Sequence, residues 1–225
     1  MITSSHILGQ DDSLLVDCQH GFKLLPEVCD AFKNMQQRAI KDGIDLQIVS
    51  SHRGYERQLG IWQNKWSGKT AVLDINETPI DTSQLSALDK AFSILTWSAL
   101  PGASRHHWGT DLDVYDKNAV LDSGQKFQLV CSEYASNGPC HALNMWLQEN
   151  AHSYLFSRPY HVFKGGIAQE PWHLSYVPTA SQFEQLLDQE TLRKAILNSN
   201  MLGADTILAN LDVIFNRFIL NKGKL

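Results

Sequence analysis

The chain has no apolar run near the roughly 20 residues that a membrane-spanning helix needs. Its first residues contain neither a basic segment nor a long apolar one, so no secretory signal is visible. Acidic residues outnumber basic ones only slightly, and the formal net charge is −5. This balance argues against the strongly basic surface of many nucleic-acid-binding proteins. We therefore expect no membrane span, no nucleic-acid partner and a cytoplasmic location, with a periplasmic one left open.

Cysteine is scarce and poorly spaced for a structural metal site. The chain has four cysteines, Cys18, Cys29, Cys131 and Cys140, and none belongs to a Cys-x-x-Cys pair. A zinc knuckle is therefore not expected. Cys131 and Cys140 flank a turn-rich stretch and could form a disulfide in an exported protein. In a cytoplasmic protein we expect the cysteines to be reduced thiols.

Repeats, low-complexity segments and linkers are also absent, so the 225 residues suit one domain. The composition, with 43% hydrophobic and 19% charged residues, is that of a globular protein. We expect a single domain over residues 1–225. Its core is expected at about 24–178, followed by a C-terminal helical extension at about 179–225.

Hydrophobic periodicity predicts both helices and strands. Helices are expected at 24–42, 54–66, 83–100 and 142–151, and as two helices broken near Gly203 in the tail at 180–221. Strands are expected at 45–51, 107–115 and 172–177, and the pattern also allows a short strand at 127–130. Few strands with segregated helices predict an α+β fold, in which helices flank a small sheet.

Residues 67–82 fit none of these patterns. They combine glycine, proline and the polar residues Asp, Asn and Glu with short apolar pieces. We expect a long loop or a small hairpin here, placed so that it overhangs a functional site.

Two short motifs carry the chemistry. One is Ser-Arg-His-His-Trp-Gly-Thr-Asp-Leu-Asp at 104–113, and the other is Glu-Pro-Trp-His at 170–173. Two imidazoles and one carboxylate would form an open zinc site, because three protein ligands leave a fourth position for water. The metal can bring this water to hydroxide near neutral pH, and a second carboxylate can take the proton. The pattern is typical of a zinc hydrolase.

The ligand register at the first motif is ambiguous from spacing alone. His106 and Asp113 are seven residues apart, so an unbroken strand would place them on opposite faces. Their convergence requires an irregularity, and Gly109 is the residue that tolerates one. His107 lies six residues from Asp113 and would share its face, and Asp111 offers a similar alternative to Asp113. The serine and glycine spacings favour His106.

The two motifs together resemble those of the zinc D-Ala-D-Ala peptidases. The matching residues are Ser104-x-His106-x-x-Gly109-x-x-x-Asp113 followed by Glu170-x-Trp172-His173. The family comprises VanY-type carboxypeptidases and VanX-type dipeptidases, within the wider lysostaphin- and hedgehog-like metallopeptidases. The resemblance covers about residues 45–178. It implies a small antiparallel sheet on which His106, Asp113 and His173 bind one zinc ion per chain, with Glu170 as the catalytic base.

A third segment adds to the resemblance. Residues 50–58 read Ser-Ser-His-Arg-Gly-Tyr-Glu-Arg-Gln, and the family has an arginine at the position of Arg53 that meets the substrate's C-terminal carboxylate. A guanidinium fork matches a carboxylate with two hydrogen bonds. The resemblance thus implies a catalytic and substrate-binding role for Arg53, and substrate-binding roles for Gln58 and Ser104. Asp111 departs from the family pattern, which often has a small residue there.

The resemblance implies a zinc-dependent carboxypeptidase that removes a C-terminal D-alanine from peptidoglycan-derived peptides. D,D-dipeptidase, L,D-carboxypeptidase and peptidoglycan endopeptidase activities are alternatives that the sequence does not separate. Outside the enzyme class, the alternative is a metal-binding module that recognises wall peptides without cleaving them. Glu170 argues against such a module, because binding alone needs no base. The oligomeric state is left open.

Overall fold

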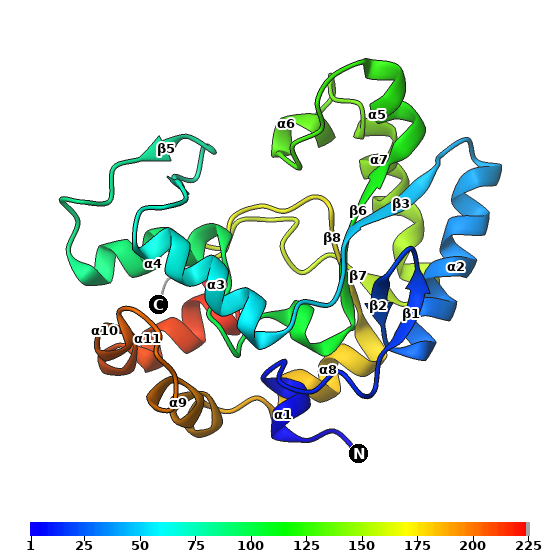
Figure 1. Cartoon of the computed structure of the whole chain (residues 1–225). Coiled ribbons are helices and arrows are strands. Elements are labelled where there is room, and N and C mark those ends of the chain that lie inside the picture. Colours follow the sequence, from blue (N-terminus) through cyan, green and yellow to red (C-terminus); the bar gives the residue numbers. More distant parts are fainter. Residues whose placement is uncertain (224–225) are drawn as a thin grey trace.

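A four-stranded antiparallel sheet lies at the centre of the computed structural model, which describes residues 1–223 (Figure 1). The strand order is β3–β6–β8–β7. The strands are β3 (Leu46–Ser50), β6 (Asp111–Asp116), β8 (His173–Tyr176) and β7 (Phe156–Ser157). The predicted α+β fold with a small antiparallel sheet is confirmed.

Alternation along β6 and β8 creates a polar face and an apolar face. Asp111 lies opposite Ser175, and Asp113 lies opposite His173. Because side chains alternate across a strand, these four polar residues share one face of the sheet. Leu112, between the two aspartates, is fully buried and belongs to the hydrophobic core. The polar face is where the chemistry-bearing motifs meet.

Helices cover the sheet from both sides (Figure 1). On one side, α2 (Pro26–Lys41) contacts β3 through a buried stripe that includes Val28, Phe32 and Met35. Its proline stands in the first turn, where the missing N–H costs no hydrogen bond. On the other side, α3 (Tyr55–Trp66) and α4 (Ala87–Trp97) contact each other.

The remaining elements before the tail are short. They are α1 (Ser4–Ile7), β1 (Val16–Gln19), β2 (Phe22–Leu24), β4 (Val72–Leu73), β5 (Pro79–Ile80), η1 (Arg105–Trp108), α5 (Lys117–Ser123), α6 (Cys131–Tyr134), α7 (His141–Asn150) and η2 (Ala151–Tyr154). The β4–β5 pair is an antiparallel hairpin. It accounts for the loop or hairpin expected at residues 67–82.

Residues 107–115 do not form the single strand that the alternation predicts. A 3-10 turn, η1, ends at Trp108, and Gly109 follows with φ 67° before β6 begins at Asp111. Glycine adopts this left-handed backbone without a steric penalty. It supplies the irregularity expected between His106 and Asp113. The short strand allowed at 127–130 is also absent, because Leu129 has φ 60° and cannot extend a strand.

The tail contains more and shorter helices than the two expected. They are α8 (Val177–Leu186), α9 (Gln189–Leu197), α10 (Ala204–Ala209), α11 (Leu211–Ile214) and a π-helical turn, η3 (Phe215–Ile219). The break expected near Gly203 is present, with φ 75° at that glycine. Pro178 does not merely stop the strand, because it stands in the first turn of α8. The division into a core and an extension stays a prediction.

The expectation of four reduced cysteines is wrong for two of them. Cys18 on β1 and Cys29 on α2 form a disulfide, while Cys131 and Cys140 are free thiols. The hairpin of β1 and β2 was not anticipated, and it is this hairpin that brings Cys18 against the first turns of α2. The bridge considered between Cys131 and Cys140 is not formed.

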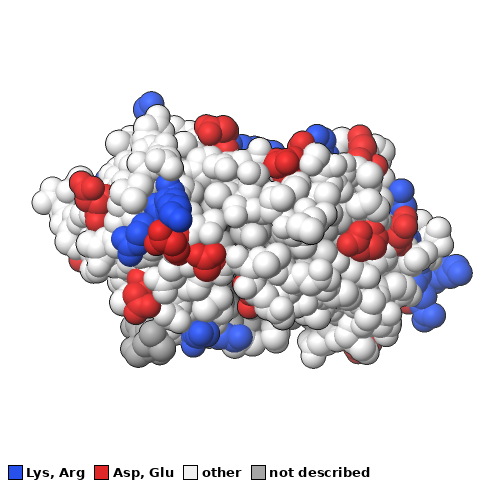
Figure 2. Space-filling model, turned by 90° about the horizontal axis from the view of Figure 1, so that it is seen from below, with Lys and Arg blue, Asp and Glu red and all other residues white. Residues whose placement is uncertain are grey.

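The surface carries charges of both signs. On the face that Figure 2 shows, small groups of acidic and basic side chains are separated by wide uncharged areas. In the described residues, no helix combines the length and the apolar character needed to cross a membrane.

Candidate metal centre and its cavity

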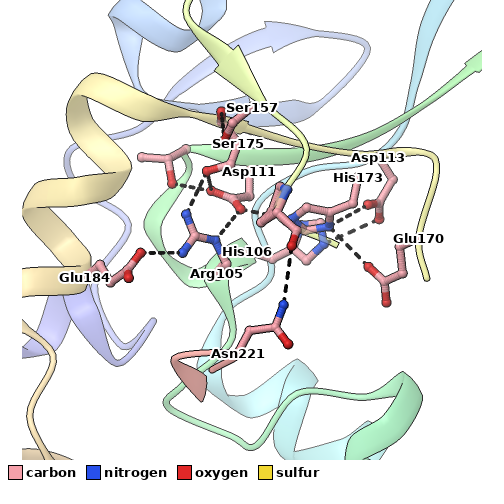
Figure 3. Close-up of polar contacts among 12 residues, drawn as sticks. Arg105, His106, Asp111, Asp113, Ser157, Glu170, His173, Ser175, Glu184 and Asn221 are labelled. Carbon is pink, nitrogen blue, oxygen red and sulfur yellow. Dashed lines mark hydrogen bonds and ion pairs between the residues drawn. The ribbon is translucent and has the colours of Figure 1, made fainter. Parts of the chain in front are cut away.

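His106, Asp113 and His173 converge from η1, β6 and β8 on the polar face of the sheet (Figure 3). One potential ligand atom from each residue lies within 4.8 Å of the other two, and all three residues are buried. Nδ1 of His173 is 3.1 Å from Oδ1 of Asp113, and Nε2 of His106 is 3.4 Å from Oδ2 of Asp113. The fold thus brings together the three residues that the sequence marked as metal ligands.

These donor atoms suit a metal ion. Nδ1 of His173 and Oδ1 of Asp113 are buried, and apart from their 3.1 Å approach to each other neither has a hydrogen-bond partner among the described residues. Buried polar atoms are rarely left unsatisfied, so such a pair calls for a partner that accepts lone pairs from both. Two imidazole nitrogens and one carboxylate form the donor set of an open zinc site. The residues therefore fit zinc.

The outer nitrogens of both histidines are engaged. Nδ1 of His106 lies 2.9 Å from the carbonyl oxygen of Ser51, to which it can donate. Nε2 of His173 lies 2.9 Å from Oδ2 of Asp111. Each outer contact fixes which nitrogen faces the cluster, as is usual for histidines that bind metals. Nε2 of His106 and Nδ1 of His173 are thus left as the inner donors.

The alternative ligand His107 is occupied elsewhere. Its Nδ1 donates to the carbonyl oxygen of Arg53, and its Nε2 accepts a hydrogen bond of 3.1 Å from the amide of Gly102. Burial lowers its pKa to about 3, which keeps the ring neutral. Asp111 is equally unavailable, because its two oxygens accept from other side chains. The geometry therefore supports the His106 and Asp113 register.

Glu170 lies beside the cluster on the segment before β8. Its Oε2 is 3.5 Å from Nδ1 of His173, and 16% of its side chain is exposed. Burial raises the pKa of Glu170 to about 7, and the charge of His173 opposes this rise. A general base works best when its pKa is close to the working pH. Glu170 has the position and the proton affinity that such a base requires.

The two histidines of the cluster differ in their affinity for protons. Burial lowers the pKa of His106 to about 4, so this ring is neutral near pH 7. Burial also opposes the charge on His173, but the hydrogen bond to Asp111 and the nearby Asp113 raise its pKa to about 10. A metal ion that binds His173 would therefore displace a proton.

Arg53 approaches the cluster from the end of β3. Its backbone amide donates to the carbonyl oxygen of His106 at 3.0 Å, and its Nη1 donates to Oε1 of Gln58 at 2.8 Å. Gln58 in turn donates to the carbonyl oxygen of Ala99 and is fully buried. Gln58 is not among the residues that line the cavity, and its contact with Arg53 holds that side chain; its substrate-binding role stays a prediction. Arg53 makes no ion pair with any described residue.

A cavity of about 340 Å³ opens onto these groups. It is lined by the metal cluster together with Glu170, Arg53 and Ser104. Its walls include Leu73 and Glu77 from the β4–β5 segment, which confirms that residues 67–82 overhang the site. The cavity therefore brings the candidate metal ligands, the carboxylate of Glu170 and the guanidinium group of Arg53 together.

Several residues of the site carry no motif that the sequence could reveal. Tyr160 packs its ring against His173, with 4.8 Å between the ring centroids. Lys65, from the last turn of α3, lines the cavity, and its ammonium group makes no hydrogen bond or ion pair with the described residues. Burial, together with the charge of Arg53, lowers the pKa of Lys65. Arg105 stands inside the first motif, but only the fold shows its three side-chain contacts.

The fold and the cluster together define a metallopeptidase. A family model described as VanY, D-alanyl-D-alanine carboxypeptidase, matches residues 21–179. The chain belongs to the VanY family, whose members are carboxypeptidases that act on peptidoglycan peptides. The family prediction made from the motifs is confirmed.

Curated proteins of two bacteria are similar to this chain. An uncharacterised protein of Haemophilus influenzae is 36% identical over 127 residues, which are 56% of this chain and 96% of the relative. A D-alanyl-D-alanine carboxypeptidase of Enterococcus faecalis is 24% identical over 174 residues, which are 76% of this chain and 54% of the relative. The chain thus spans about half the length of the relative whose activity is named.

Solved structures share the fold. VanYB in complex with D-alanine-D-alanine has a TM-score of 0.55 at 21% identity, covering 85% of this chain and 91% of the other. The LdcB LD-carboxypeptidase has a TM-score of 0.54 at 27% identity, covering 81% and 78%. A VanY D,D-pentapeptidase variant in complex with Zn(II) has a TM-score of 0.51 at 23% identity, covering 79% and 88%.

Proposed function

We propose that this protein is a zinc-dependent carboxypeptidase that removes the C-terminal D-alanine from peptidoglycan-derived peptides. The observation that carries the proposal is the position of Arg53. It lines the same cavity as the metal cluster and Glu170, and it forms no ion pair within the described part of the chain. A free terminal carboxylate would supply two charge-assisted hydrogen bonds to its guanidinium group.

Lys65 supports the recognition of an anionic substrate end. Lys65 and Arg53 line the same cavity, and neither forms an ion pair with the described residues. The charge of Arg53 lowers the pKa of Lys65, so an anionic substrate group bound beside them would be attracted by both cations. The terminal carboxylate of a peptide is an anion of suitable size, whereas the backbone of a continuing chain carries no charge there. This argues for removal of a terminal residue over cleavage within a chain.

The residues of the cavity divide the work of hydrolysis. Zinc held by His106, Asp113 and His173 would supply an acidified water and polarise the scissile carbonyl. Glu170 takes the proton of the attacking water on its carboxylate and later gives it to the leaving amine. Arg53 holds the terminal carboxylate and so sets which peptide bond lies at the cluster.

The stereochemistry and the length of the substrate decide among the related activities. Similarity to the LdcB LD-carboxypeptidase keeps an L,D-carboxypeptidase as the second candidate, since its substrate also ends in a carboxylate. Similarity to VanYB bound to D-alanine-D-alanine supports the D,D activity. A D,D-dipeptidase requires a cavity that is closed beyond a two-residue substrate. An endopeptidase requires a cavity that stays open, so that the peptide can continue past the cleaved bond. A wall-peptide module without activity would make no use of Glu170.

One experiment tests the proposal. Zinc-loaded protein is incubated with D-Ala-D-Ala and with tripeptide, tetrapeptide and pentapeptide stems, and the products are identified by mass. We expect loss of one D-alanine from the pentapeptide. Cleavage of the tetrapeptide alone would replace the D,D assignment by an L,D one. No turnover of any peptide by zinc-loaded protein would favour the binding module.

The Cys18–Cys29 disulfide bears on location. Disulfides persist in oxidising compartments and are rare in the cytoplasm. The pairing therefore supports the periplasmic alternative over the cytoplasmic prediction, and it agrees with a substrate from the mature cell wall. Fractionation of the producing cells, with blotting for this protein, would distinguish the two locations.

A further inference from the structure

An ionic network that is buried except at Glu184 lies beside His173 (Figure 3). Arg105 donates from Nε to Oδ2 of Asp111 at 2.8 Å and from Nη2 to Oγ of Ser175 at 2.7 Å. Its Nη1 donates to Oε2 of Glu184 on α8 at 2.9 Å. Glu184 lies beyond the residues that the VanY model matches. The network thus joins the metal cluster to the first helix of the tail.

Asp111 is the centre of this network and is completely buried. Its Oδ2 also faces Nε2 of His173 at 2.9 Å, and its Oδ1 accepts from Thr110 at 2.6 Å and from Ser175 at 2.9 Å. Every contact of the carboxylate is therefore to a donor. Burial of a carboxylate is unfavourable by itself, and the charge of Arg105 with these hydrogen bonds offsets it.

We propose that Asp111 is the positioning residue for His173, on which metal binding depends. This inference rests on the proposed zinc site. Asp111 accepts a hydrogen bond from the Nε2–H of His173, so that Nδ1 faces Asp113 and Glu170 and is the nitrogen left for a metal ion. If the ring of His173 could rotate and exchange between its two tautomers, Nδ1 would face the cluster as a metal ligand only part of the time. A carboxylate behind a metal-binding histidine fixes the ring and raises its basicity.

Arg105 keeps Asp111 from acting as a metal ligand itself. An unpaired carboxylate beside the cluster could itself turn towards a cation and compete with Asp113. Arg105 occupies Oδ2 of Asp111 and neutralises its charge, while Ser175 and Thr110 occupy Oδ1. Asp111 is thereby confined to the outer position.

The test compares zinc affinity in wild type, Asp111→Asn and Asp111→Ala, by competition with a chromophoric chelator. We expect Asp111→Ala to bind zinc about 10- to 100-fold more weakly, as is typical when such a partner is lost. Asp111→Asn should lose less, because its amide oxygen can still accept from His173. Asp116→Asn is the matched control. Asp116 is buried on the same strand, but its contacts are to the amides of Asp45 and Ala119.

Cobalt substitution provides a second readout that a general loss of stability would not change. The visible absorption of bound Co²⁺ depends on ligand geometry, so it should change in both Asp111 variants and remain unchanged in Asp116→Asn. Circular dichroism of the metal-free proteins checks that each variant folds. If Asp111→Ala does not fold, Asp111→Asn still decides the question.

The possible outcomes separate this inference from the proposed function. Wild-type protein that binds no zinc would overturn both. Wild-type protein that binds zinc and hydrolyses peptide, together with folded Asp111 variants of equal zinc affinity and unchanged cobalt spectrum, would overturn the positioning role alone. Equal weakening in Asp111→Asn and Asp116→Asn would also overturn it, because the effect would then be one of stability.

Discussion

Burial beside the metal cluster gives Glu170 a pKa that suits a general base. Its carboxylate lies 3.5 Å from Nδ1 of His173, and burial raises its pKa to about 7. Glu170→Gln preserves the shape of the side chain but cannot accept a proton. We expect kcat to fall by roughly 100-fold or more while zinc content stays at the wild-type level. Steady-state kinetics with metal analysis checks this, and a near-normal kcat would assign the base elsewhere.

Arg53 is the residue on which exopeptidase specificity depends. Arg53→Ala would leave the substrate carboxylate without its bidentate partner in a partly desolvated cavity, at a cost of about 2–4 kcal/mol. This corresponds to a loss of roughly 30- to 1000-fold in kcat/KM for a peptide that ends in D-alanine. Arg53→Lys should recover only part of the loss, because an ammonium group lacks the planar fork.

A peptide with an amidated C-terminus is the control for Arg53. Amidation should reduce kcat/KM in wild type about as much as the Arg53→Ala substitution does, and it should cost little more in the variant. The comparison is a double cycle over two enzymes and two peptides. Equal cleavage of acid and amide by wild type would contradict the anchoring role and favour an endopeptidase.

The sequence could identify residues that carry their own motif, but not residues defined only by contact. His106, Asp113, Glu170 and His173 belong to two motifs whose joint occurrence in one chain is specific, although neither motif is specific alone. For Gln58, no pattern in the sequence shows that its amide contacts Arg53 and Ala99, and its substrate-binding role stays a prediction. Tyr160 and Glu184 belong to neither motif, and a single tyrosine or glutamate carries no signal without the fold.

At the scale of elements, the β4–β5 hairpin connects two walls of the cavity. Oε1 of Glu77 accepts a 2.9 Å hydrogen bond from the amide of Cys131, and the Sγ of Cys131 donates to the carbonyl oxygen of Gln169. Glu77 lies in the turn between β4 and β5, while Cys131 begins α6. The hairpin is thus linked to the residue next to Glu170.

Glu77→Ala should loosen this wall without altering the chemistry. Loss of one hydrogen bond, worth about 0.5–1.5 kcal/mol, predicts a rise of roughly three- to tenfold in KM, with kcat within about twofold of wild type. Asp81→Ala is the control, because the Asp81 carboxylate contacts only the nearby Ser83 among the described residues. An unchanged KM in Glu77→Ala, or an equal change in Asp81→Ala, would show that the contact does not shape the cavity.

The prediction of helices and strands succeeded where the hydrophobic periodicity of one element type continues over many residues. It failed where the backbone changes from one element type to another within a few residues. Helix α2 and strand β3 lie within two residues of the expected bounds, since a long apolar stripe or a regular alternation marks each. The segment around Gly109 alternates in sequence but contains a 3-10 turn, because its side chains are held by tertiary contacts. The tail divides into short helices whose breaks lack the usual proline or glycine signals, apart from Gly203.

At the scale of the whole molecule, the tail is part of the site's support. Glu184 of α8 holds Arg105, and the side chain of Arg217 in η3 donates to the carbonyl oxygen of Gly165 at 2.7 Å. Asn221 donates to the carbonyl oxygen of Pro159, next to Tyr160. The residues beyond the family match therefore brace the loop that carries one wall of the cavity. The sequence predicted helices here, but it could not predict their contacts with a distant loop.

The central claim is that three residues from separate segments hold one zinc ion in a cavity built for a peptide end. The most direct measurement is a crystal structure of the zinc-loaded protein, with the ion located by anomalous scattering. We predict one ion per chain, about 2.0–2.2 Å from Nε2 of His106, a carboxylate oxygen of Asp113 and Nδ1 of His173. Absence of an ion at this cluster, or an ion bound by His107 or Asp111, would contradict the account.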